Sequence, residues 1–197
     1  MPTDGPTFRL LVGLGNPGGE YSGTRHNVGF MVLDRLAAVL GATFRADKKW
    51  KADIAVAGDV FLLKPKTYMN LSGESVGEIA RFYKIEPARI LVVLDDMALS
   101  LGRLRFRDRG SHGGHNGLRS ILDHLGTQDV PRLRVGIGPA ADADAATGHV
   151  LGRFAVDERP LVAQSLDRAV EAVRFAQEND LPSAMNRFNT NTPTTTL

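Results

Sequence analysis

Apolar and polar positions along the chain follow two periods, which predict alternating strands and helices. Short apolar runs bounded by turn residues are typical of buried strands, and they occupy residues 8–14, 54–56, 60–64, 90–94, 102–107 and 133–137. Apolar residues three and four positions apart are typical of amphipathic helices, and they occupy residues 28–40, 72–83, 116–125 and 158–179, with a short helix near 182–188. Strands that alternate with helices in this way predict an α/β fold.

Turn and capping residues set the limits of these elements. Asn116 and Asp157 are expected to be N-caps, and Gly41 and Gly126 are expected just beyond helix C-termini. Gly58-Asp59 joins two strands as a hairpin, which adds an antiparallel pair. We therefore expect a mixed twisted sheet covered by helices, in a single domain over residues 1–188. The polar segment 189–197 is expected to be a disordered tail.

Composition narrows the class of protein. A chain of 197 residues is long enough to bury roughly 70% of its unfolded surface. It has no apolar run near the ~20 residues of a membrane span, and its first residues lack the pattern of a signal peptide. The chain contains no cysteine, which excludes disulfides, a cysteine nucleophile and thiolate zinc sites. We expect a cytoplasmic monomer without an obligate protein partner and without contact to membranes.

Positive charge gathers in one part of a chain whose net charge is only +2. Arg103, Arg105 and Arg107 alternate along a predicted strand, so their side chains should share one face. Arg109 follows, and Arg132 and Arg134 form a second basic segment. A basic face favours a polyanionic partner, although charges that guard a strand edge would give the same pattern.

The glycine-rich turn after the first strand permits two interpretations. Gly13, Gly15 and Gly18 match the spacing of a dinucleotide-binding turn, which must lead directly into a helix. Pro17 and further glycines stand where that helix should begin, and the helical period starts only near Val28. An ordinary strand-to-helix turn explains the glycines, but it leaves unexplained the polar cluster that follows, Asn16, Arg25, His26 and Asn27.

Candidate chemistry lies in four polar segments at the ends of strands or the beginnings of helices, at residues 16–27, 64–73, 94–97 and 110–117. In an open α/β sheet such segments can converge on one crevice. His26 is the best general base, because a neutral imidazole can take a proton from water. Asp95, which directly follows a buried run, is preferred over Asp96 as the acceptor that orients this imidazole.

Amide side chains accompany this pair. Asn16, Asn70 and Asn116 offer donors and acceptors without charge, which suits a polar substrate or a developing oxyanion, although turn and cap duty would also explain them. His112 and His115 have a spacing that could suggest a metal, but two glycines separate them and the spacing identifies no third ligand. The chain has no G-x-S-x-G elbow, so a serine hydrolase is poorly supported.

Taken together, the four segments resemble the bacterial peptidyl-tRNA hydrolase family. The matching pieces are GLGNPGGEYSGTRHNVGF at 13–30, KPKTYMNLSG at 64–73, ILVVLDDMALSLG at 90–102, GSHGGHNGLRSI at 110–121 and RLRVGIG at 132–138. They occur in the family's order and span most of residues 8–138. The C-terminal third matches mainly in general character.

The resemblance implies a single α/β domain that cleaves the ester between a peptide and tRNA, with no metal or other cofactor. His26 would be the catalytic base and Asp95 its orienting partner. Substrate-binding roles would fall to Asn16, Tyr21, Tyr68, Met69, Asn70, His115 and Asn116, and the tRNA would be bound by Arg103, Arg105 and Arg107. Directly before Asp95 the family often has a histidine, where this chain has Leu94. Three positions after Asp95 the family often has an aspartate, where this chain has Ala98. An RNA-binding protein without turnover and a nucleotide-dependent enzyme are the competing classes.

Overall fold

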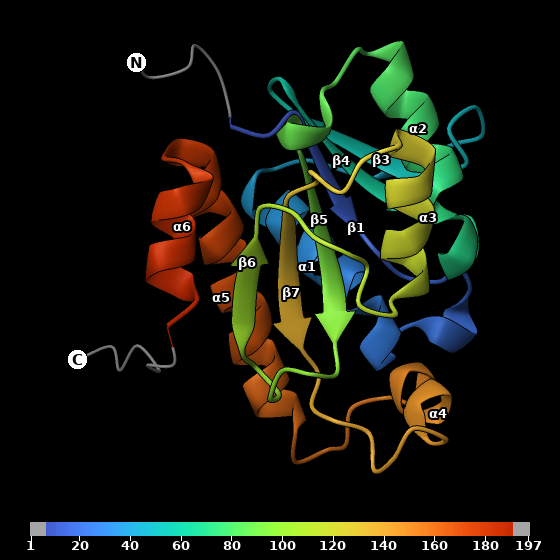
Figure 1. The fold of residues 1–197 in the computed structure, drawn as a ribbon, viewed down its shortest axis with the longest axis vertical. Helices are drawn as coiled ribbons and strands as arrows, with labels where there is room; N and C mark the ends of the chain where they lie inside the picture. Colours follow the sequence, from blue (N-terminus) through green and yellow to red (C-terminus); the bar gives the residue numbers. More distant parts are fainter. Residues whose placement is uncertain (1–6, 191–197) are drawn as a thin grey trace.

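Seven strands form one sheet in the computed structural model, which describes residues 7–190 (Figure 1). They are β1 (Leu10–Gly13), β2 (Arg45–Asp47), β3 (Ala52–Ala57), β4 (Val60–Pro65), β5 (Ile90–Asp96), β6 (Leu104–Arg107) and β7 (Arg132–Gly136). Their order across the sheet is β2-β3-β4-β1-β5-β7-β6. The four central strands β4, β1, β5 and β7 are parallel, whereas β2, β3 and β6 join as antiparallel neighbours. The prediction of a mixed sheet is therefore confirmed.

Helices cover both faces of this sheet. The α-helices are α1 (Val28–Val39), α2 (Ser72–Phe82), α3 (Asn116–Leu125), α4 (Ala146–Leu151), α5 (Arg159–Glu178) and α6 (Leu181–Phe188). Short 3-10 helices are η1 (Gly19–Tyr21), η2 (Arg25–Asn27), η3 (Met69–Leu71) and η4 (Pro87–Arg89). One apolar cluster joins α1, α5 and α6 to one face of the sheet, and a second joins α2 and α3 to the other. Helix α4 lies at the end toward which β5 and β7 point (Figure 1), and its Val150 packs against the first cluster.

The glycine motif of the first turn has a packing explanation. A Cβ atom at Gly13 would lie 2.4 Å from the carbonyl oxygen of Gly29, and one at Gly29 would lie 2.4 Å from the backbone nitrogen of Leu14. Strand β1 and helix α1 therefore approach backbone to backbone. The turn leads into the three-residue η1, and the first α-helix begins only at Val28, so the turn does not lead into the N-terminus of an α-helix as a dinucleotide site requires.

Several local expectations need correction. Strand β2 and helix α4 were not predicted, because β2 is a three-residue polar strand and α4 buries none of its residues. The N-cap of α3 is His115, not Asn116, and the N-cap of α5 is Glu158, not Asp157. Gly126 adopts the expected left-handed conformation after α3, with φ of 67°.

Asn189, the first residue of the expected tail, is hydrogen-bonded to the sheet. The amide of Asn189 accepts a hydrogen bond from the backbone nitrogen of Phe106 at 2.7 Å and donates to the carbonyl of Phe106 at 3.1 Å. Residues 191–197 of the expected tail, like residues 1–6, lie outside the described part of the chain. Among residues 7–190, no helix is both long and apolar enough to cross a membrane.

Candidate active site

Three chain segments bring polar groups to the edge where the central parallel strands end. Asn16 follows β1, the backbone N–H of Met69 follows β4, and Asp95 is the sixth residue of β5. The parallel ladders place the ends of β4, β1 and β5 side by side, in register from Leu11 with Leu62 and Leu91. The α3 N-terminus and the η2 turn complete this edge, because His115 and His26 both reach Asp95. This convergence is the crevice that an open α/β sheet offers to a ligand.

A single carboxylate oxygen of Asp95 lies between two histidines. Its Oδ1 is 2.8 Å from Nδ1 of His26 and 2.9 Å from Nε2 of His115. The Asp95 side chain is only 3% exposed, and the two imidazoles are 12% and 10% exposed. The predicted His26–Asp95 contact is therefore present, while the contact to His115 was not anticipated.

The hydrogen bonds of the two imidazoles distinguish their roles. His115 caps α3, and its Nδ1 accepts a hydrogen bond from the backbone nitrogen of Leu118 at 3.3 Å. In a neutral imidazole the proton then lies on Nε2, which donates to Asp95. His26 meets Asp95 through Nδ1, so its proton lies on Nδ1 and its Nε2 carries a lone pair. By this assignment His26, unlike His115, keeps an unprotonated ring nitrogen that no protein group among residues 7–190 occupies.

The environment holds Asp95 in its charged form. Burial opposes the charge and acts to raise the pKa of Asp95, but electrostatic attraction and hydrogen bonds from His115 and His26 lower that pKa well below its usual range. Asp96, the alternative, points elsewhere: its Oδ2 pairs with Arg134, and its Oδ1 accepts from the backbone nitrogen of Ala98 at 2.8 Å. The preference for Asp95 over Asp96 therefore agrees with the geometry.

Asn16 is fixed from two sides. Its backbone nitrogen donates to Oδ1 of Asn27, and its carbonyl accepts from Nδ2 of Asn27, both at 2.9 Å. Its own side-chain Oδ1 accepts from the backbone nitrogen of Met69 at 2.7 Å. Within the described chain Nδ2 of Asn16 donates no hydrogen bond to the protein, so this held amide can donate to a ligand. The sequence drew attention to Asn27 without giving it a role, and the structure shows that it orients Asn16.

The other substrate-binding candidates are less closely joined. Met69 is buried, and a Cβ atom at Gly117 would lie 2.4 Å from its sulfur, so η3 and α3 meet tightly at this point. Asn116 is exposed, and its Oδ1 accepts from Arg119 at 2.8 Å. Asn70 and Tyr68 are exposed on the η3 segment, and Tyr21 is half-buried in η1. No hydrogen bond among residues 7–190 joins the side chains of Asn116, Asn70, Tyr68 and Tyr21 to the cluster of Asp95, His26 and His115.

Of the three arginines predicted to share one face, Arg105 and Arg107 lie on β6, the edge strand, whereas Arg103 precedes that strand. Leu104 and Phe106 pack into the cluster with α5 and α6, so the alternating Arg105 and Arg107 face the opposite side. The pKa of Arg105 is lowered first by the charge of Arg107, then by partial burial and by Arg134 and Arg103, which shows how closely these charges lie.

Two of the basic residues singled out in the sequence have structural partners. The guanidinium of Arg132 is buried and donates to the carbonyls of Gly110, Ser111, Gln128 and Val130. Arg134 pairs with Asp96. Arg132 therefore supports the loop before α3 and is not part of an exposed basic face. By contrast, Nε of Arg103 is buried and has no hydrogen-bond partner among the described residues.

The suggested pairing of His112 with His115 as metal ligands does not form. Nδ1 of His112 accepts from the backbone nitrogen of Gly114 at 3.0 Å, whereas both nitrogens of His115 are engaged elsewhere. Among residues 7–190, the group with the composition and proximity of a metal site is His26, Asp95 and His115, whose ligand atoms all lie within 4.8 Å of one another. These atoms already satisfy each other as donors and acceptor.

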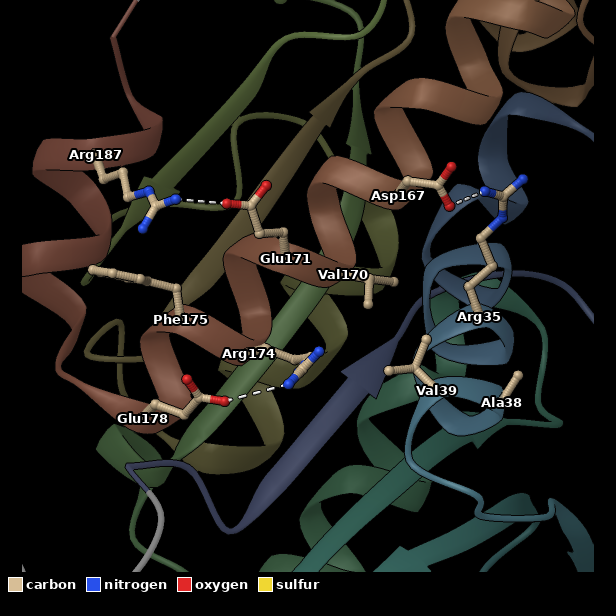
Figure 2. Close-up of a pocket in the computed structure, with 10 residues that line it drawn as sticks. All are labelled: Arg35, Ala38, Val39, Asp167, Val170, Glu171, Arg174, Phe175, Glu178 and Arg187. Atoms are coloured by element: carbon tan, nitrogen blue, oxygen red, sulfur yellow. Dashed lines mark hydrogen bonds and ion pairs between the residues drawn. The ribbon is translucent and has the colours of Figure 1, made fainter. Parts of the chain in front are cut away.

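A cavity of about 660 Å³ lies on the face of the sheet that α1, α5 and α6 cover, between these three helices (Figure 2). Three ion pairs line it: Arg35 with Asp167, Arg174 with Glu178 and Arg187 with Glu171. Three arginines against three acids leave this lining without net charge. We call it the ion-pair groove, and it contains none of the candidate catalytic residues.

Comparison with known proteins gives a consistent result. The family model described as peptidyl-tRNA hydrolase matches residues 10–196. The peptidyl-tRNA hydrolase of Akkermansia muciniphila is 48% identical over 181 residues, covering 92% of this chain and 95% of that protein. The one from Synechococcus sp. (strain JA-2-3B'a(2-13)) is 50% identical over 187 residues, covering 93% and 84%. The crystal structure of peptidyl-tRNA hydrolase from Acinetobacter baumannii superimposes with a TM-score of 0.89 at 40% identity, covering 95% of this chain and 97% of that one.

Proposed function

This chain belongs to the peptidyl-tRNA hydrolase family, and from this premise we propose that it releases tRNA by hydrolysing the ester between a peptide, or an N-blocked aminoacyl group, and the tRNA. We propose that His26 is the general base and Asp95 its partner. The observation that carries this assignment is the 2.8 Å contact between Nδ1 of His26 and the buried Asp95, which leaves Nε2 of His26 free to accept a proton. The reaction needs no metal or other cofactor.

The proposed reaction has two steps. Nε2 of His26 takes a proton from water as the water oxygen attacks the ester carbonyl carbon. The charge of Asp95 stabilises the imidazolium that forms, and Nδ2 of Asn16 donates to the substrate. When the tetrahedral intermediate collapses, the bond between carbonyl carbon and ribose oxygen breaks. The imidazolium returns its proton to that oxygen, which leaves a free carboxylic acid and an intact tRNA.

We propose that the arginine face binds the tRNA backbone. Arg103 directly precedes β6 and lies near the candidate site, because its carbonyl accepts a hydrogen bond from the backbone nitrogen of Gly136 at the end of β7. Arg105 and Arg107 extend the positive charge away from that end at about 3.3 Å per residue. Phosphate contacts of this kind position a nucleic acid without reading its sequence. The cytoplasmic location, the monomeric state and the absence of a protein partner stay predictions.

A turnover assay tests this proposal. Purified protein is incubated with N-blocked aminoacyl-tRNA, with and without a strong chelator, and free tRNA is measured. We expect equal turnover in both conditions. Binding of tRNA without turnover would instead support an RNA-binding protein on this scaffold. Activity that chelation abolishes and zinc restores would indicate that His26, Asp95 and His115 act as metal ligands.

A further inference from the structure

Arg25, the neighbour of His26, is a buried cation with three partners from distant parts of the chain. Its Nη2 lies 2.7 Å from Oε2 of Glu158, and its Nη1 donates to the carbonyl of Ile137 at 3.3 Å. Its guanidinium also stacks 4.7 Å from the ring centroid of Phe154. These partners come from the end of β7 and from the segment that leads into α5. The proposed water activation leaves all of these contacts unexplained.

The backbone around Arg25 is joined to the same segment. The backbone nitrogen of Arg25 donates to the carbonyl of Gly152 at 2.9 Å, and Thr24 forms an isolated β-bridge with Arg153. Glu158 is itself held, because its Oε2 also accepts from the backbone nitrogen of Ala155 at 2.7 Å. The hydrogen bond from Arg25 is the main cause that lowers the pKa of Glu158, so this carboxylate stays charged at neutral pH.

The shape of η2 connects these contacts with the catalytic histidine. Arg25, His26 and Asn27 form a single 3-10 turn, in which successive side chains point about 120° apart. No side chain caps the N-terminus of this turn. Each of the three side chains is directed to a different place: Arg25 to Glu158, His26 to Asp95, and Asn27 to Asn16. Because one short turn carries all three, fixing the direction of Arg25 fixes the rotation of His26.

We propose that Arg25 and Glu158 are positioning residues, whose ion pair sets the rotation of the η2 turn so that Nδ1 of His26 meets Asp95 and Nε2 faces the substrate. This proposal rests on the proposed role of His26 as the base. This ion pair is partly buried, and burial makes an ion pair a poor source of stability, because desolvation offsets much of the attraction. Orientation of the catalytic turn gives this pair a function that stability alone does not.

The experiment compares Glu158→Gln and Arg25→Lys with a matched control pair. Arg187 and Glu171 also meet at 2.7 Å, but in the ion-pair groove and at 53% and 55% exposure, against 10% and 27% for Arg25 and Glu158. We expect kcat to fall about tenfold to a hundredfold in Glu158→Gln and Arg25→Lys, because small misplacement of a reacting group costs this much. We expect KM to change little, and Arg25→Lys to retain more activity than Arg25→Ala. Arg187→Lys and Glu171→Gln should match the parent protein.

A second measurement separates positioning from general loss of structure. The ¹⁵N spectrum of imidazole-labelled protein reports the tautomer of His26, and we expect the Nδ1–H form of the parent to give way to a mixture in Glu158→Gln. Unchanged kcat in these variants would overturn the proposal, and so would reduced kcat with an unchanged His26 spectrum. His26→Ala distinguishes the two levels. Full turnover by His26→Ala would refute the proposed mechanism. If His26→Ala loses turnover while Arg25→Lys and Glu158→Gln turn over at the parent rate, only the positioning role is refuted.

Discussion

The candidate active site and the ion-pair groove handle charge in opposite ways. In the groove, exposed arginines and acids pair one to one, as Arg187 with Glu171 shows at 53% and 55% exposure. In the site, one carboxylate at 3% exposure serves two histidines and leaves a nitrogen of His26 free. Exposed pairs contribute little free energy, whereas a buried, shared carboxylate sets the protonation of its neighbours. The groove offers a cavity of about 660 Å³, but the site is the one with free hydrogen-bonding capacity.

The largest expected effect is that of removing the free imidazole. His26→Ala should lower kcat by about 10²–10⁴-fold, the usual contribution of general-base catalysis, while the protein stays folded and binds tRNA. Single-turnover hydrolysis and a tRNA binding assay measure the two properties. Near-normal turnover by folded His26→Ala would mean that the candidate site is no more important for hydrolysis than the groove. Arg35→Ala, in the groove, is the control and should hydrolyse the substrate at the parent rate.

Asp95→Asn tests the shared carboxylate through pH. Because the pKa of Asp95 is lowered in the folded state, its ionised form stabilises the fold above its unfolded pKa of about 4. That stabilisation is lost as pH falls through the lower folded pKa. Asp95→Asn should therefore lose less unfolding free energy than the parent when the pH is lowered below about 4, as urea unfolding at several pH values can measure. Equal acid sensitivity of the two proteins would contradict this assignment.

The same variant should also be a poor catalyst. The amide that replaces the carboxylate of Asp95 preserves shape but cannot stabilise the imidazolium that forms during attack, so kcat should fall by on the order of 10²-fold or more. Activity equal to that of the parent at every pH would count against the pairing of Asp95 with His26.

A smaller effect is expected from the arginine face. Replacing Arg105 and Arg107 with Ala should raise KM for peptidyl-tRNA and reduce the log–log salt slope by ~1 for each phosphate that the variant no longer binds. Cleavage of a minimal ester substrate should stay close to that of the parent, since His26 and Asn16 remain. Parent affinity and parent salt slope in the double variant would show that these arginines only solvate an edge strand.

Local pattern in the sequence is enough to predict part of the site and most of the sheet. A position directly after a buried run singles out Asp95, and the period of two in strands places Arg105 and Arg107 on one face. Both placements agree with the structure. The mixed sheet is also predictable, since parallel crossovers and a hairpin have different sequence signatures.

Contacts that depend on strand order are beyond that reasoning. Strand β7 lies between β5 and β6, and nothing in the periodicity reveals this insertion. Arg25 and Glu158 are 133 positions apart. Their contact exists only because the end of β7 and the beginning of α5 meet the η2 turn. The family resemblance points to His115 as a substrate ligand, but its bond to Asp95 requires a loop path that turn residues alone do not fix.

The smallest expected effect belongs to the groove and completes the comparison. Arg187 and Glu171 each have more than half of their side chain exposed, and exposed pairs are worth about 0–1 kcal/mol. Replacing both with Ala should change the free energy of unfolding by less than about 1 kcal/mol and leave kcat and KM unchanged, as urea unfolding and the hydrolysis assay can determine. Arg187 also stacks on Phe175, with its guanidinium 4.7 Å from the ring centroid, so Arg187→Lys beside Arg187→Ala separates the charge from the stacking. A large loss of activity in the double variant would mean that the groove communicates with the site, because Glu171 belongs to α5 and Arg187 to α6, and neither is bonded to His26, Asp95 or His115.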